Sequence, residues 1–262
     1  MTQDKKLKGT LNKLSILKFL ARFGWLTAPM IAALVWPTSA QSQAMARRTL
    51  SGMLDTKLVL KRNLAEGVDC LTLSSAGARM LTEQTGIKAS SGASLLLGNP
   101  THRACSNWFL IAKINTGFKV WTEHEIQSGH SPLRSVSGKV PDALVMTDFG
   151  LLWVEVENTW KNRSEREKVV RFCTAHLPLT SLHEMQELAP DYYLFRVVIV
   201  GTTPESLRAM VRSYSDAHAA QELSDSQAAD VELVYQPLTA RLTPAQAAVS
   251  GSLWYEALNH SD

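Results

Sequence analysis

The sequence predicts an α/β protein with two domains, the first over residues 1–86 and the second over residues 101–262, joined by a linker at 87–100. In the first domain, helix-like segments are followed by a pair of strand-like segments. In the second, strands and helices alternate, which is typical of a layered domain with a central mixed sheet. Small residues from Ala89 to Ser94 predict the linker between them.

Positive charge is concentrated at the N-terminal end. Residues 1–66 contain eleven Lys and Arg against three Asp and Glu, whereas the rest of the chain contains sixteen basic and twenty-one acidic residues. The two parts therefore carry about +8 and −5. A basic module on an acidic body is typical of a nucleic-acid-binding domain attached to an enzyme, and it also fits a segment that lies on a membrane surface. A hydrophobic content of 45% excludes a disordered or fibrous chain.

The first domain is predicted to be a winged helix-turn-helix. Three short helices followed by a β-hairpin form this arrangement, in which the third helix enters the major groove and the hairpin contacts phosphates. The predicted helices cover 14–23, 30–36 and a segment that Ser39 or Ser42 opens and Leu54 ends, and the strands cover 57–62 and 68–73. The predicted DNA contacts are Gln41, Gln43, Arg47, Arg48, Lys57, Lys61 and Arg62. The alternative is a helical interaction module whose charges are merely solvated.

The second domain is predicted from nine further segments, preceded by a short helix at 74–85. Its helices are expected at 102–115, 164–177, 204–221 and 245–258, and its strands at 118–126, 143–146, 151–156, 193–200 and 231–235.

Three acidic residues predict a metal site on two neighbouring strands. Asp142 opens one strand, and Glu155 and Glu157 lie two apart on the next, so both glutamates leave the same face. Carboxylate oxygens suit Mg²⁺ or Mn²⁺, and phosphodiester cleavage needs such an ion to activate water and offset charge. The alternative is a solvated sheet face. However, the rest of this strand is apolar, and buried like charges repel unless a cation lies between them.

This pattern resembles the core of the PD-(D/E)xK, or restriction-endonuclease-like, nucleases. Pro141 and Asp142 begin a strand hairpin, which ends in Glu-x-Glu before a helix. The family's usual final lysine is here Glu157, which favours a mechanism in which the metal ion, and not a lysine, activates water. The resemblance leaves Lys161 or Lys139 to supply the missing positive charge.

The same resemblance implies an upstream acid as a further metal ligand. Glu123 and Glu125 both match it, and Glu125 is the preferred residue. The proposed catalytic set is therefore Asp142, Glu155, Glu157 and Lys161, and the proposed Mg²⁺ or Mn²⁺ ligands are Asp142, Glu155, Glu157 and Glu125.

A winged helix placed before such a nuclease core resembles the replication-relaxation family, which includes the MobC-type relaxases of mobilisable plasmids. His102 and Asn107 on the first helix of the second domain belong to the matching features. The resemblance implies a metal-dependent endonuclease that nicks one strand of double-stranded plasmid DNA at a transfer origin, with other mobilisation proteins or a coupling protein as partners. Two alternatives stay open: a non-catalytic DNA-binding accessory protein or regulator of mobilisation or replication, and a transposon or restriction nuclease.

The apolar stretch from Trp25 to Trp36 follows several lysines and resembles a secretion signal or a membrane span. Lys18 and Arg22 interrupt the longer apolar run, and Pro29 breaks it into two short helices. The three cysteines are widely spaced, without a CxxC pair, which excludes a disulfide framework and a zinc knuckle. We therefore expect no membrane insertion and a reducing, cytoplasmic compartment.

Overall fold

The computed structural model describes residues 2–64, 67–158, 163–179 and 185–251. The chain forms two compact units, Met1–Pro100 and Thr101–Asp262. Each unit is described by itself.

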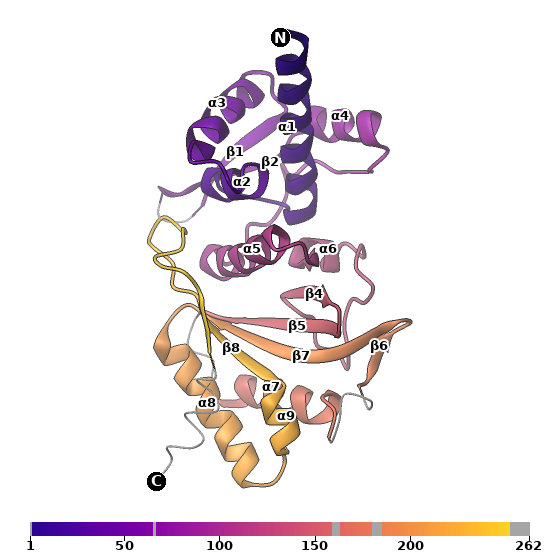
Figure 1. Ribbon diagram of the computed structural model, residues 1–262, viewed down its shortest axis with the longest axis vertical. Coiled ribbons are helices and arrows are strands. Elements are labelled where there is room, and N and C mark those ends of the chain that lie inside the picture. The colour runs from indigo at the N-terminus through magenta and orange to yellow at the C-terminus, as the bar shows by residue number, and fades with distance from the viewer. Residues whose placement is uncertain (1, 65–66, 159–162, 180–184, 252–262) are drawn as a thin grey trace. The chain divides into compact units, whose positions relative to one another are not determined.

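The first unit contains four helices and a β-hairpin in its described residues (Figure 1). The elements are α1 (Thr2–Phe23), α2 (Ala28–Val35), α3 (Ser42–Asp55), β1 (Val59–Asn63), β2 (Asp69–Leu73) and α4 (Ser75–Thr85). The two strands pair antiparallel, and an isolated bridge between Leu26 and Leu71 adds the segment after α1 to the edge of the hairpin. Three helices followed by a hairpin therefore occur in the predicted order. Helix α1 begins at Thr2, about three turns before the predicted 14–23, because its polar first turns lack apolar periodicity but contain good helix formers.

The stretch that resembles a secretion signal forms the core of this unit. Trp25, Leu26, Met30 and Ile31 are fully buried, together with residues of α1 such as Leu20. The Trp25 Nε1–H also donates to the Leu97 carbonyl oxygen over 3.3 Å. Among the described helices, none combines the length and the apolar character that crossing a membrane requires.

The second unit is a mixed α/β domain with a central mixed sheet. Its elements are α5 (Pro100–Asn115), β3 (Lys119–Thr122), α6 (Glu123–Gln127), β4 (Ala143–Thr147), β5 (Gly150–Glu157), α7 (Arg163–His176), β6 (Glu187–Ala189), β7 (Tyr192–Gly201), α8 (Pro204–Ala219), α9 (Asp225–Ala229), β8 (Val231–Tyr235) and β9 (Val249–Gly251). The strand order is β3-β4-β5-β7-β8-β9, with β6 paired to β7. The pairs β5–β7 and β7–β8 are parallel and the others are antiparallel, which confirms the predicted fold class at this level.

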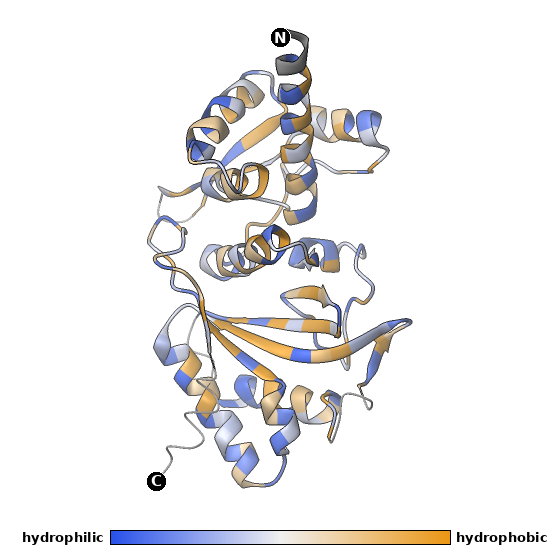
Figure 2. Ribbon diagram, viewed as in Figure 1, coloured by the Kyte–Doolittle hydropathy of each residue, from blue (hydrophilic) through white to orange (hydrophobic). Residues whose placement is uncertain are grey.

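Helices cover both faces of this sheet. The parallel strands β5, β7 and β8 are neighbours in this order and are joined through α7 and α8. Because such connections are right-handed and both move along the sheet in the same direction, the two helices lie on the same face. Figure 1 shows α7, α8 and α9 on that face and α5 and α6 on the other. The strands are apolar along most of their length (Figure 2), as expected for strands covered on both sides.

Two predicted elements of this domain are wrong. The strand expected at 118–126 ends at Thr122, because Thr122 caps α6 and forms a capping box with Glu125. The sequence predicts a helix at 245–258, but this range contains strand β9, whose Val249 and Ser250 pair with β8. Residues 252–262 lie outside the described part of the chain. The short elements β6 and α9 have three and five residues, too few for a periodic pattern to indicate them.

Candidate active site

The first acidic residue lies where β4 begins beside β5. The register pairs Ala143 with Val154, which places Asp142 across from Glu155. The backbone N–H of Asp142 donates to the Val154 carbonyl oxygen (3.0 Å), and its Oδ2 accepts the N–H of Val156 (2.8 Å). The same Oδ2 lies 3.2 Å from Nε2 of His102 on α5. Backbone and side-chain contacts thus hold this carboxylate at the strand edge.

Glu155 and Glu157 occupy core positions of the sheet. They follow Trp153 at intervals of two on β5, on the face covered by α7 and α8, where the Trp153 ring lies 4.3 Å from that of Phe172. Glu155 is 3% exposed and Glu157 is 2% exposed. The alternative of a solvated sheet face is therefore wrong for both glutamates.

The Glu155 carboxylate has a partner at each oxygen. Its Oε1 accepts the Trp153 Nε1–H over 2.5 Å, and its Oε2 lies 2.7 Å from the Lys139 ammonium. Lys139 is held in place by a two-residue hairpin turn, in which Val136 and Lys139 exchange two backbone hydrogen bonds of 2.9 Å. The turn residues Ser137 and Gly138 both have positive φ, as a type I′ turn requires.

Burial controls the ionisation of Glu155. Loss of solvent, followed by the nearby charge of Asp142, raises the pKa of the Glu155 carboxyl from 4.5 to about 7, although Lys139 and Trp153 act in the opposite direction. A carboxyl with a pKa near neutrality gains or loses a proton under ordinary conditions, and such shifts are common at functional sites.

Two neutral polar groups lie behind the glutamates. The Cys173 thiol of α7 and the Tyr214 hydroxyl of α8 form a hydrogen bond of 3.2 Å. Burial raises the pKa of Cys173 to about 12, and burial and the neighbouring Cys173, Glu155 and Glu157 raise the pKa of Tyr214 well above 10. Both groups therefore stay protonated, and neither is available as an anionic nucleophile.

One other predicted metal ligand, Glu125, lies elsewhere. Glu125 Oε2 accepts the backbone N–H of Thr122 over 2.9 Å, so its carboxylate caps α6. Lys161 lies outside the described residues. Lys139, three residues before Asp142, contacts Glu155, whereas the sequence placed Lys161 in the catalytic set and offered Lys139 only as another stand-in. The structure thus brings together Asp142, Glu155 and Lys139.

The donors at this position fit a magnesium or manganese ion. Asp142 Oδ1 has no hydrogen-bond partner among the described residues, and each oxygen of Glu155 has a second lone pair. Mg²⁺ in phosphoryl-transfer sites is usually held by one or two protein carboxylates, with water and substrate phosphates as the other ligands. Across the described part of the chain, no three His, Cys, Asp or Glu side chains are grouped to hold a metal by themselves. A site in which two carboxylates and a substrate phosphate share the ion agrees with this preference of Mg²⁺ and with the absence of a larger group of protein ligands in the described residues.

The predicted DNA contacts of the first unit differ in exposure. Gln41, Gln43, Arg47 and Arg48 are exposed at the start and along one side of α3, and Lys57 is exposed after it. Lys61 is also exposed and lies 2.7 Å from Asp69 across the hairpin.

Arg62 has a different environment. Its NH1 donates to the carbonyl oxygens of Gly92 (3.0 Å) and Leu95 (2.6 Å) and so ties the segment after α4 to the hairpin. We therefore assign Arg62 a structural contact.

A scan against protein-family models found no match, and neither did searches of curated proteins and of solved structures.

Proposed function

We propose that this protein is a metal-dependent DNA endonuclease that nicks one strand of double-stranded DNA. The observation that carries the proposal is the pairing of Asp142 with Glu155 on adjoining strands, with the Lys139 ammonium 2.7 Å from the glutamate. A carboxylate pair with a lysine beside it is the combination that PD-(D/E)xK nucleases use on a phosphodiester.

The residues of the site have separate tasks in this proposal. Asp142 and Glu155 would hold Mg²⁺ or Mn²⁺, with Glu157 as the next oxygen donor on the same face. The bound ion would supply water activation and charge compensation at the scissile phosphate. The cation of Lys139 keeps Glu155 partly ionised at neutral pH, since it opposes the rise in pKa that burial and Asp142 cause. Trp153 fixes the direction of the Glu155 carboxylate through its Nε1–H.

The first unit would supply DNA recognition. Three helices and a hairpin with exposed Gln43, Arg47 and Arg48 on α3 suit a winged helix whose third helix reads the major groove. By its resemblance to the replication-relaxation family, the protein is proposed to act as a mobilisation relaxase at a plasmid transfer origin, with other mobilisation proteins or a coupling protein as partners.

Nicking of supercoiled plasmid tests the proposal. The intact protein should convert plasmids that carry candidate transfer origins to the open circular form when Mn²⁺ or Mg²⁺ is present, and chelation should stop the reaction. Asp142→Asn and Glu155→Gln should reduce nicking to the level without protein. Asp148→Asn is the matched control, because Asp148 is an exposed carboxylate in the turn at the far end of the same β4–β5 hairpin. Nicking that survives both site variants contradicts the proposal.

One observation favours a second function. The Glu155–Lys139 ion pair neutralises the buried carboxylate without a metal ion, as would suit a non-catalytic DNA-binding regulator that has kept the nuclease-like domain. Sequence-specific DNA binding without any effect of divalent ions on affinity or nicking supports this regulator over the nuclease.

A further inference from the structure

A cleft opens beside Lys139, the residue whose ammonium pairs with Glu155. Its volume is about 390 Å³, and it lies between the turn that carries Lys139 and helix α7. The side chains that matter to its chemistry are Lys139, Lys168, Arg171, Phe172, Ser137 and His176.

Side-chain contacts hold the walls of the cleft in place. Ser137 Oγ and His176 Nε2 lie 3.0 Å apart, which ties the hairpin turn to the end of α7. His176 Nδ1 lies 2.6 Å from Gln186 Oε1, so both ring nitrogens have partners. The His176 ring also packs 4.7 Å from the Phe172 ring, which in turn packs on Trp153 beside Glu155. One wall of the cleft is therefore continuous with the candidate active site.

Positive charge predominates along this cleft. Lys139, Lys168 and Arg171 line it, against a single acidic lining residue, Glu165, which lies 2.6 Å from Lys168. Arg171 has no acidic partner among the described residues, and its side chain is exposed. An anion that enters the cleft would meet Lys168 and Arg171 without displacing a buried ion pair.

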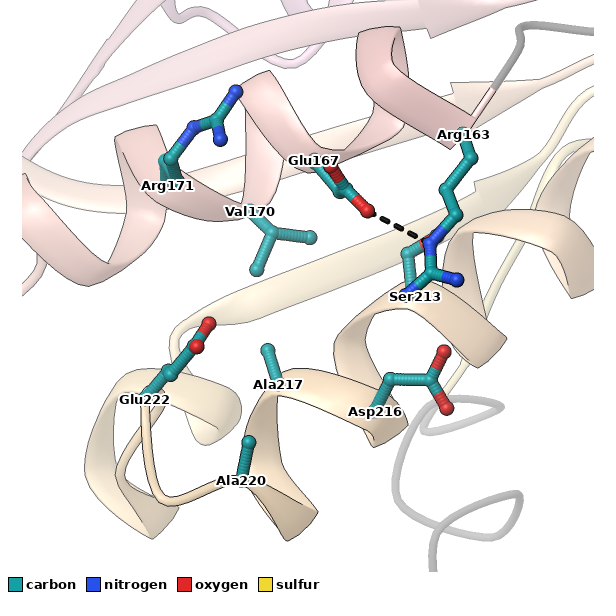
Figure 3. Close-up of a pocket in the computed structure, with 9 residues that line it drawn as sticks. All are labelled: Arg163, Glu167, Val170, Arg171, Ser213, Asp216, Ala217, Ala220 and Glu222. Carbon is teal, nitrogen blue, oxygen red and sulfur yellow. Dashed lines mark hydrogen bonds and ion pairs between the residues drawn. The ribbon is translucent and has the colours of Figure 1, made fainter.

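A second cavity on the same helix has the opposite character. It lies between α7 and α8, has a volume of about 370 Å³ and is shown in Figure 3. Three carboxylates line it, from Glu167, Asp216 and Glu222. Its two cations are Arg171, which lines both cavities, and Arg163, which pairs with Glu167 over 2.7 Å (Figure 3). Since the two cavities have similar volumes, charge separates them, and only the cleft beside Lys139 suits a polyanion.

We propose that the cleft beside Lys139 binds one nucleotide of the DNA strand next to the scissile phosphate. Lys168 and Arg171 would hold its phosphate, and the sugar and base would occupy the rest of the cleft beside the exposed Ala175. A volume of about 390 Å³ lies in the range of small-ligand pockets, and a positively charged groove that follows the backbone is a common way to bind single strands. This inference rests on the proposed nuclease function and names the part of the substrate that the site holds.

The test measures binding without catalysis. The intact protein is titrated with the single-stranded dinucleotide pTpT in EDTA, by calorimetry. The double variant Lys168→Ala/Arg171→Ala should bind about fivefold to thirtyfold more weakly, as expected for the loss of two solvent-accessible charge contacts. Arg163→Ala, which removes the cation that lines the second cavity but not the cleft, should bind like the wild type. Ala175→Trp, at an exposed lining position, should fill the cleft and give the same loss as the double variant.

Failure of this inference differs from failure of the proposed function. If pTpT binds equally to the wild type, the double variant and Ala175→Trp, the cleft is not a nucleotide site, whether or not the protein nicks plasmid. If pTpT binding depends on the cleft but no nicking occurs, the nucleotide site stands and the nuclease proposal is wrong. In an active protein the double variant should raise KM for plasmid several-fold and leave kcat nearly unchanged, and an unchanged KM overturns the inference.

Discussion

The two units of this chain place their charged residues in opposite environments. In Met1–Pro100 the cations proposed to contact DNA, such as Arg47 and Arg48, are exposed on α3. In Thr101–Asp262 two of the acids proposed for catalysis, Glu155 and Glu157, are buried at core positions of β5. Exposed cations attract a polyanion at long range. Burial instead raises the pKa of the Glu155 carboxyl, and the groups that contact it act in the opposite direction.

This difference predicts how substitutions act. Removing an exposed cation should change DNA binding and leave folding almost intact, whereas changing a group around Glu155 should affect folding and chemistry together.

The first prediction concerns the ring that supports Glu155. Trp153 is fully buried and packs on Phe172, so Trp153→Ala should lower the free energy of unfolding by about 3–5 kcal/mol. Trp153→Phe keeps most of the packing but removes the Nε1–H donor, so it should cost less stability and raise the pKa of Glu155 further. Urea denaturation and the pH profile of nicking measure the two effects. A Trp153→Phe variant with an unchanged pH profile would show that the hydrogen bond does not control Glu155.

The second prediction concerns pH. Because the folded state raises the pKa of Glu155, it binds this proton more tightly than the unfolded chain does. Its contribution to stability is complete below pH 4.5 and is lost as pH rises to about 7, by up to about 3 kcal/mol. Glu155→Gln should therefore lack part of the fall in unfolding free energy between pH 5 and pH 8 that the wild type shows in metal-free buffer. Asp148→Asn is the control and should keep the wild-type slope, and identical slopes in all three proteins contradict the prediction.

The third prediction separates Arg62 from the other cations of the first unit. Because its guanidinium holds two carbonyl oxygens of the segment after α4, Arg62→Ala should destabilise the protein by about 1.5–3 kcal/mol. DNA affinity, measured well below the melting temperature, should change little. Thermal unfolding and fluorescence anisotropy with duplex DNA give the two readouts. A large loss of DNA affinity with normal stability would indicate that Arg62 contacts DNA.

The fourth and smallest effect is expected on α3. Arg47→Ala and Arg48→Ala should leave the melting temperature unchanged, because both side chains are exposed. Each should reduce the slope of log affinity against log salt concentration by about one if the residue contacts a phosphate. A residue that reads a guanine edge should instead lose discrimination at one base pair. Duplex binding at several salt concentrations separates these outcomes, and Arg79→Ala, which changes an exposed residue of α4, is the control.

The sequence predicted the strand positions of Asp142, Glu155 and Glu157 because that geometry is local. A period of two along β5 fixes Glu155 and Glu157 on one face, and a short hairpin brings Asp142 alongside. Glu125 was placed wrongly on a strand, because the capping box that begins α6 was not recognised. The contact of Lys139 with Glu155 depends on a type I′ turn. That turn is tied to α7 by the contact of Ser137 with His176, which spans 39 positions of sequence. Contacts between distant segments leave no periodic signal, so only the folded chain shows them.

Binding of Mn²⁺ to the intact protein tests the central claim most directly. At pH 8, where Glu155 is mostly ionised, calorimetry should show one Mn²⁺ site that is lost in Asp142→Asn and in Glu155→Gln. Glu123→Gln, which changes a carboxylate that lies 3.6 Å from Arg103, should bind as the wild type does. Equal Mn²⁺ affinity in all four proteins, or no binding by the wild type even with duplex DNA present, would contradict a site built on Asp142 and Glu155.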